Sequence, residues 1–118
     1  MTPEQQRKIL EYAAKACGID AQWDCPERGM MRLTPDGIDT MSWNPITNSA
    51  DTAEMCAKLG VNSEWDLVSD AVICDVNWDD TCTYPTVTSF FSNYANSRLK
   101  AWMYAATMCA AKIGGYTE

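Results

Sequence analysis

Residues 64–78, with the sequence EWDLVSDAVICDVNW, decide the fold class of this chain. Acidic residues alternate there with apolar ones, which are Trp65, Leu67, Val72, Cys74, Val76 and Trp78. A period of two is typical of strands that bury one face and leave the other in water. We therefore expect strands over residues 64–69 and 71–78, joined by a tight turn at Ser69-Asp70. A helix capped by Ser63 and ending near Ala71 is the alternative, because short apolar runs are ambiguous by period alone.

Negative charge is concentrated around these strands. Between Leu59 and Ser97 the chain has no Lys or Arg, and its acidic residues are Glu64, Asp66, Asp70, Asp75, Asp79 and Asp80. The net charge is −7, so most of it belongs to this third of the protein. We expect the carboxylates to project from one solvated sheet face. Such a face is either a solubility device or a docking surface for a basic partner.

Helices are expected on both sides of this segment. Thr2 and Gln5 form a capping box and Pro3 fits the first helical position, so a helix is predicted from Pro3 to Cys17, ended by Gly18. A second helix is predicted from Asn48 or Ser49 to Leu59, and a third from Asn96 or Ser97 to Ile113. The small residues expected to pack the second helix on a sheet are Ala50, Ala53, Cys56 and Ala57. The third should be the most buried, through Leu99, Trp102, Met103, Ala106, Met108, Cys109 and Ile113.

The remaining segments predict short strands and loops. Residues 30–33 and 38–43 read as a hairpin around the turn Thr34-Pro35-Asp36-Gly37, residues 21–28 as a loop with an extended start, and residues 86–91 as a last strand. At 118 residues the chain is long enough for one core. We therefore predict a single α+β domain over residues 1–118, with a small antiparallel sheet and helices packed on it.

The second half of the chain has a recognisable order of segments. It begins with the run Trp43-Asn44-Pro45-Ile46-Thr47-Asn48, which leads into an Ala-rich helix, then a sheet, and then the helical sequence SRLKAWMYAA at residues 97–106. In this order of segments the chain resembles the phage ABA-sandwich family. The resemblance covers about residues 42–112. It implies a three-layer α-β-α sandwich encoded by a bacteriophage and acting in the infected bacterial cell. It brings no catalytic motif to this chain.

Several kinds of chemistry are excluded or disfavoured. The chain has no histidine, which removes Ser-His and Cys-His nucleophile pairs and histidine-containing metal sites. It has no GxGxxG, P-loop or GxSxG motif. The expectation is a non-enzyme with no catalytic residues, cofactor or metal. The six cysteines show no CxxC spacing and are predicted to be reduced, because no signal peptide or long apolar segment is present and the chain reads as cytoplasmic.

Two further groups of residues are candidates for binding. The candidate ligands for a Ca²⁺ or Mg²⁺ site are Asp75, Asp79 and Asp80. Their spacing is not that of an EF-hand loop, so the favoured interpretation is a strand end with solvated carboxylates. Trp23 and Trp43 lie in or beside predicted loops, where a partner contact is more plausible than at the other tryptophans, although ordinary packing is the favoured interpretation there too.

These patterns predict a non-enzymatic, phage-encoded accessory protein of the host cytoplasm. Its partner would be a bacterial host or defence protein with a basic surface, as for an anti-restriction or anti-CRISPR inhibitor. The predicted partner-binding residues are Glu64, Asp66, Asp75, Asp79, Asp80, Trp23 and Trp43. The negative charge disfavours direct binding to nucleic acid or to a membrane. The sequence does not decide between a monomer and a homodimer.

A small-molecule or nucleotide-binding signal sponge is the alternative, and an enzyme and a minor virion component rank below it. A nucleotide site needs convergent cationic groups. They would come from Arg28, Arg32, Lys58, Arg98 and Lys100.

Overall fold

The computed structural model describes residues 1–34, 37–76 and 85–117. Within these ranges the helices are α1 (Pro3–Cys17), α2 (Ser49–Leu59) and α3 (Arg98–Ile113), with a short 3₁₀ helix η1 (Phe91–Tyr94). The first antiparallel sheet contains β1 (Ala21–Cys25), β2 (Gly29–Thr34) and β3 (Gly37–Trp43). The second contains β4 (Val61–Asp66), β5 (Ala71–Val76) and β6 (Thr86–Phe90). The predicted α+β class is confirmed.

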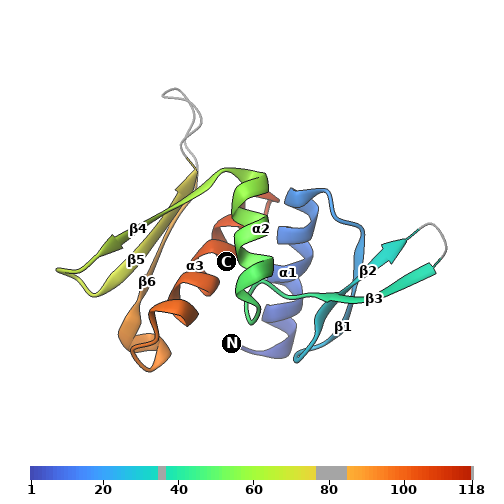
Figure 1. Ribbon diagram of the computed structural model, residues 1–118, viewed down its shortest axis with the longest axis horizontal. Coiled ribbons are helices and arrows are strands. Elements are labelled where there is room, and N and C mark those ends of the chain that lie inside the picture. Colours follow the sequence, from blue (N-terminus) through green and yellow to red (C-terminus); the bar gives the residue numbers. More distant parts are fainter. Residues whose placement is uncertain (35–36, 77–84, 118) are drawn as a thin grey trace.

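The order of the layers differs from the α-β-α sandwich that the family resemblance implies. Figure 1 shows the helices in the middle of the molecule, with one sheet on each side. α1 packs on the first sheet and on α3, and α3 packs on the second sheet. The physical reason lies in α3, whose residues 105–111 are all buried. A helix that is apolar around its circumference belongs in the interior.

α1 has the predicted bounds and caps. The Thr2 hydroxyl accepts a hydrogen bond from the Gln5 amide at 3.1 Å, and the Thr2 amide donates to Gln5 Oε1 at 2.9 Å. Gly18 ends the helix with a φ of 67°, in the left-handed region that favours glycine. The Ile19 amide then donates to the Ala14 carbonyl at 2.9 Å, which completes the cap.

α2 also begins and ends as predicted, but its buried face was predicted wrongly. The residues it buries are Thr52, Met55 and Leu59, while Ala50, Ala53 and Ala57 are exposed. The run before α2 is a structured connection from the first sheet. The Asn44 amide donates to Asp51 Oδ2 at 2.9 Å, and the Thr52 hydroxyl donates to the Pro45 carbonyl at 2.6 Å. These bonds orient α2 so that its larger side chains face the core.

The strands differ from the predictions mainly at their ends. Residues 21–25 form β1, an edge strand instead of a loop, and β4 begins at Val61 and ends at Asp66. Residues 67–70 are a turn, in which Asp70 has a φ of 51°. The hairpin of β2 and β3 is confirmed, and its turn at residues 35–36 lies outside the described residues.

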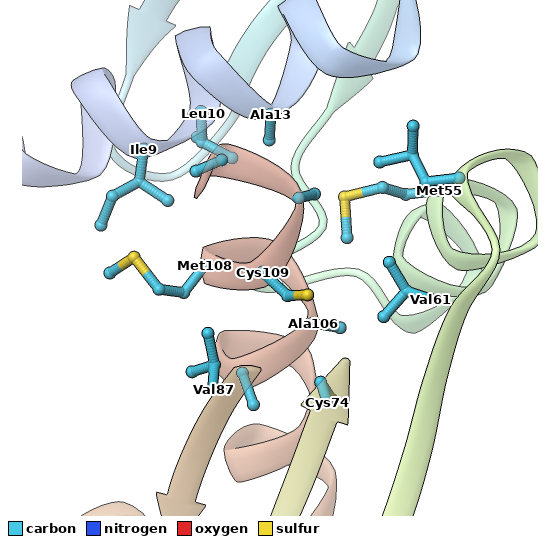
Figure 2. Packing of buried hydrophobic residues seen from close by; sticks show 14 of the residues in the cluster. Ile9, Leu10, Ala13, Met55, Val61, Cys74, Val87, Ala106, Met108 and Cys109 are labelled. Atoms are coloured by element: carbon cyan, nitrogen blue, oxygen red, sulfur yellow. The ribbon is translucent and has the colours of Figure 1, made fainter. Parts of the chain in front are cut away.

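One cluster of buried residues connects the helices with both sheets. Figure 2 shows its centre, where Ile9 and Leu10 of α1 lie on one side of Met108 and Cys109. Val87 of β6 lies on the other side of α3. The apolar surface of α3 is therefore covered by α1 and by the second sheet together. Leu99, in the first turn of α3, is exposed, contrary to its predicted place in the core. No helix among the described residues is long and apolar enough to cross a membrane.

We predict that the buried cysteines are unreactive thiols in the native protein. Burial raises the pKa of Cys17 to about 11 and that of Cys109 to about 12, so almost none of either thiol is ionised at pH 8. Thiol titration of the unfolded protein without reductant should find six free thiols. In the native protein, alkylation mapped by mass spectrometry should leave Cys17 and Cys109 unmodified while the more exposed Cys25 reacts. Fewer than six thiols, or rapid native labelling of Cys109, would contradict this prediction.

Candidate partner-binding surface

The register of the second sheet places three of the predicted acidic residues on one face. Glu64 pairs with Ile73, Asp66 with Ala71, and Asn62 with Asp75. Opposite residues of an antiparallel pair share a face, so Glu64, Asp66 and Asp75 point to the same side of the sheet. The neutral residues of that face are Asn62, Ala71, Ile73, Thr86, Thr88 and Phe90. We call this surface the acidic face.

The helices lie on the opposite side of this sheet. Val72 and Cys74 alternate with the residues of the acidic face along β5 and are fully buried. α3 packs against β5 and β6, and Figure 1 shows the helical layer on one side of the sheet. Glu64, Thr88 and Phe90 are exposed, whereas Asp66 and Asp75 are partly exposed. The charged side chains of the acidic face are therefore at least partly open to solvent, although Ala71 within this face is buried.

None of the ion pairs found among the described residues includes Glu64, Asp66 or Asp75. The ion pairs among described residues join Arg7 with Glu11, Lys8 with Glu4, Arg28 with Asp24, and Arg32 with Glu54. All of them lie in α1, α2 or the first sheet with its β1–β2 turn. Because the chain has no Lys or Arg between residues 59 and 97, the second sheet cannot supply its own counter-charge. Its potential is available to attract a positively charged partner.

Asp66 also has a structural role in the β4–β5 turn. Its Oδ1 accepts hydrogen bonds from the amides of Ser69 at 3.3 Å and Val68 at 3.1 Å. The bonds from Ser69, chiefly that of its backbone amide, lower the pKa of the Asp66 carboxyl, because they stabilise its ionised form. This contribution to folding is present above the ordinary carboxyl pKa and is lost as the pH falls through the lowered value. Substitutions that test binding are therefore better made at Glu64 and Asp75.

An exposed apolar group beside the acidic face was not anticipated. Trp65 and Leu67 were predicted to face the core, yet they are 47% and 62% exposed, and Val68 is 96% exposed. Leu67 and Val68 belong to the turn and not to a strand. Trp65 is on the helix side of β4, with its ring centroid 6.1 Å from that of Phe91. The sequence pattern carries no signal for this exposure, because Trp65 alternates with acids as a core residue would.

The two tryptophans predicted as partner contacts are not near the acidic face. Trp43 is fully buried, which overturns the prediction of a surface contact there. It is the last residue of β3, on the face that turns to the helices, and not a loop residue. Trp23 is half-buried in β1, where it lines a groove of about 460 Å³ between α1 and the first sheet. Asp79 and Asp80 lie outside the described residues.

The five residues expected for a nucleotide site do not all converge, although Arg32 and Lys58 both lie near Cys17. Arg28 pairs with Asp24 and Arg32 with Glu54, while Arg98 lies over the Phe91 ring. Lys100 lines a cavity of about 300 Å³, next to one of about 490 Å³. The walls of the larger cavity are Met1, Gln5, Ile9, Asn93, Tyr94, Tyr104, Met108 and Tyr116. This lining contains no Lys or Arg side chain, so it offers no cluster of basic side chains for a phosphate.

No group of three or more metal-ligating side chains occurs within the described ranges. The predicted Ca²⁺ or Mg²⁺ alternative depends on Asp79 and Asp80, which those ranges do not include. Comparisons with protein-family models, curated proteins and solved structures found no match.

Proposed function

We propose that this chain is a non-enzymatic binding protein whose acidic face docks on a Lys- and Arg-rich surface of a partner protein. The supporting observation is that Glu64, Asp66 and Asp75 extend from two paired strands on the side of the sheet away from the helices. Carboxylates arranged in this way steer a basic surface toward the sheet and orient it there.

The proposed partner is a bacterial host or defence protein encountered in the cytoplasm during phage infection. Such a partner would present cationic grooves that otherwise hold nucleic-acid phosphates. A row of carboxylates on a rigid sheet occupies such a groove in place of the phosphates, which is the action of an inhibitor. Origin from a phage and an inhibitory role are part of this proposal.

We predict that reversing charge on the acidic face removes partner capture without unfolding the protein. The test variant is Glu64→Lys with Asp75→Lys, and the matched control is Asp20→Lys with Glu27→Lys, which changes the net charge equally on exposed residues of the other half. Immobilised proteins are incubated with bacterial lysate at about 50 and 300 mM salt, where the screening length differs roughly twofold. Bound proteins are quantified by mass spectrometry.

The face variant should capture at least about tenfold less of a salt-sensitive partner, because each substitution replaces an attraction by a repulsion. The control should capture it as the wild type does, and circular dichroism and thermal melting should show that both variants are folded. A folded face variant that retains its partner at both salt concentrations would contradict the proposal. If only the control variant loses capture of the partner, the partner binds at the groove beside Trp23, which Asp20 also lines, and not at the acidic face.

A further inference from the structure

Among the described residues, no strand pairs with β4 along its outer edge. In the described chain the strand order is β4-β5-β6, so β4 has a neighbour on one side only. The Phe91 amide donates to the Asp70 carbonyl at 2.9 Å, so residues 70 and 91 form a hydrogen-bonded pair just before β5 and just after β6. Hydrogen-bonded and non-hydrogen-bonded pairs alternate along an antiparallel ladder, so every second pair from there is hydrogen-bonded. Residues 72 and 74 therefore bond to β6, and residues 71, 73 and 75 bond to β4.

The same alternation assigns the backbone groups of β4. Residues 62, 64 and 66 direct their N–H and C=O groups toward β5, because they pair with residues 75, 73 and 71. Ser63 and Trp65 direct theirs to the open edge. Glu64 and Asp66 are thus bonded within the sheet through their backbones, while their side chains lie on the acidic face.

This edge lacks three of the features that usually prevent strands from adding to a sheet, and its only charged side chains are the acidic Glu64 and Asp66. The pairing of β4 with β5 is regular over six residue pairs, whereas both strand pairs of the first sheet contain an irregularity. Val61–Asp66 contains no Pro and no Lys. Bulges, prolines and lysines are the common means of protecting an edge. The edge of β4 is therefore suited to receive another strand.

The side chains of β4 indicate what such a strand would carry. Glu64 and Asp66 are two residues apart, which places them about 7 Å apart along the strand. A residue added opposite Glu64 would be in a pair without direct hydrogen bonds, where cross-strand side chains come closest. Between the two acids, Trp65 presents a half-exposed ring on the other side of the strand. The matching strand has basic side chains at alternate positions and an apolar one between them.

We propose that β4 binds an extended segment of the partner as a fourth strand of the second sheet, with Lys or Arg residues facing Glu64 and Asp66 and an apolar residue against Trp65. This inference rests on the proposed function, because it names the part of the basic partner that the acidic face receives. A second copy of this chain is a poor occupant. Antiparallel pairing of two β4 strands would continue one acidic face across both chains and place like charges together.

The probe is a synthetic peptide of nine residues in which lysine and valine alternate. Its control has the same composition, with the lysines together and the valines together. Affinities are measured by isothermal titration calorimetry at about 50 mM salt. The alternating peptide should bind the wild type at least about tenfold more tightly, because only it can place its charges on one face while pairing with the edge.

Two substitutions at Ser63 separate backbone pairing from charge attraction. Ser63→Pro removes an outward N–H while leaving the acidic side chains and the ladder to β5 in place. Ser63→Ala keeps that N–H but, like the proline variant, loses the hydroxyl that accepts a hydrogen bond from Trp102 Nε1 at 2.8 Å. We expect Ser63→Pro to weaken binding of the alternating peptide about tenfold relative to Ser63→Ala.

Amide hydrogen exchange gives a readout that does not depend on the folding of a variant. In the wild type, the amides of Ser63 and Trp65 should exchange quickly and become protected when the alternating peptide is added. Unchanged exchange in the presence of bound peptide would overturn strand addition. Protection that depends on protein concentration without peptide would overturn it in favour of a second copy.

The outcomes also separate this inference from the proposed function. If Glu64→Lys with Asp75→Lys abolishes peptide binding but Ser63→Pro does not, docking on the acidic face holds and strand addition fails. If neither variant changes binding of either peptide, both ideas fail.

Discussion

Replacing Trp43 by alanine is expected to reduce the free energy of unfolding by about 3–5 kcal/mol, the range found when large aromatic residues are removed from protein cores. Trp43 is fully buried and is opposite Met30 in the pairing of β2 and β3, so its ring joins the first sheet to the helices. Domains of this size are stable by only about 5–15 kcal/mol, so a large part of the protein would be unfolded or close to it. Urea unfolding followed by circular dichroism measures the loss.

Two control substitutions make this result specific. Trp65→Ala removes a half-exposed ring from the other sheet and should cost no more than about half as much, because less apolar area is buried there. Trp43→Phe keeps most of the buried volume. It also removes the indole N–H, which has no hydrogen-bond partner among the described residues, so its cost should be clearly smaller than that of alanine. Equal losses for Trp43→Ala and Trp65→Ala would contradict the assignment of Trp43 to the core.

Replacing Gly114 by alanine is expected to cost about 3 kcal/mol, at the upper end of the range for overpacking. Gly114 follows the last residue of α3, and a Cβ atom there would collide with the backbone carbonyl oxygen of Tyr12 in α1. Its φ of −75° suits any residue, so the requirement for glycine comes from the close approach of the two helices. Relief would require a shift of α1 against α3, at the centre of the fold.

Gly18→Ala is the matched control for this prediction. Gly18 also follows a helix, but it has a φ of 67° and no atom near the position of an added Cβ. Its replacement should cost only about 1–2 kcal/mol, the usual penalty for a left-handed alanine. Thermal unfolding of the two variants ranks these costs. A larger loss for Gly18→Ala would show that α1 and α3 separate easily.

The acidic face was predictable from sequence to a useful extent. The alternation of acids with apolar residues placed Glu64, Asp66 and Asp75 together, and the register confirms that they share a face. Asp79 and Asp80 lie beyond the described residues, so their part in the face stays a prediction. The open edge of β4 could not be predicted, because strand order depends on which segments pair across the whole chain and not on the period of one segment.

What the sequence determined by itself is local. The bounds of α1 follow from Thr2, Gln5 and Gly18, and the start of β5 follows from its period of two, because hydrogen bonds and side-chain directions within a few residues decide these features. The tertiary structure alone decided that the helices lie between two sheets, that Trp43 is buried and that Trp65 is half-exposed. An apolar side chain in a strand specifies only that one face is to be covered. Which element covers it, and how far along the strand that cover extends, depends on how all the apolar faces are matched at once.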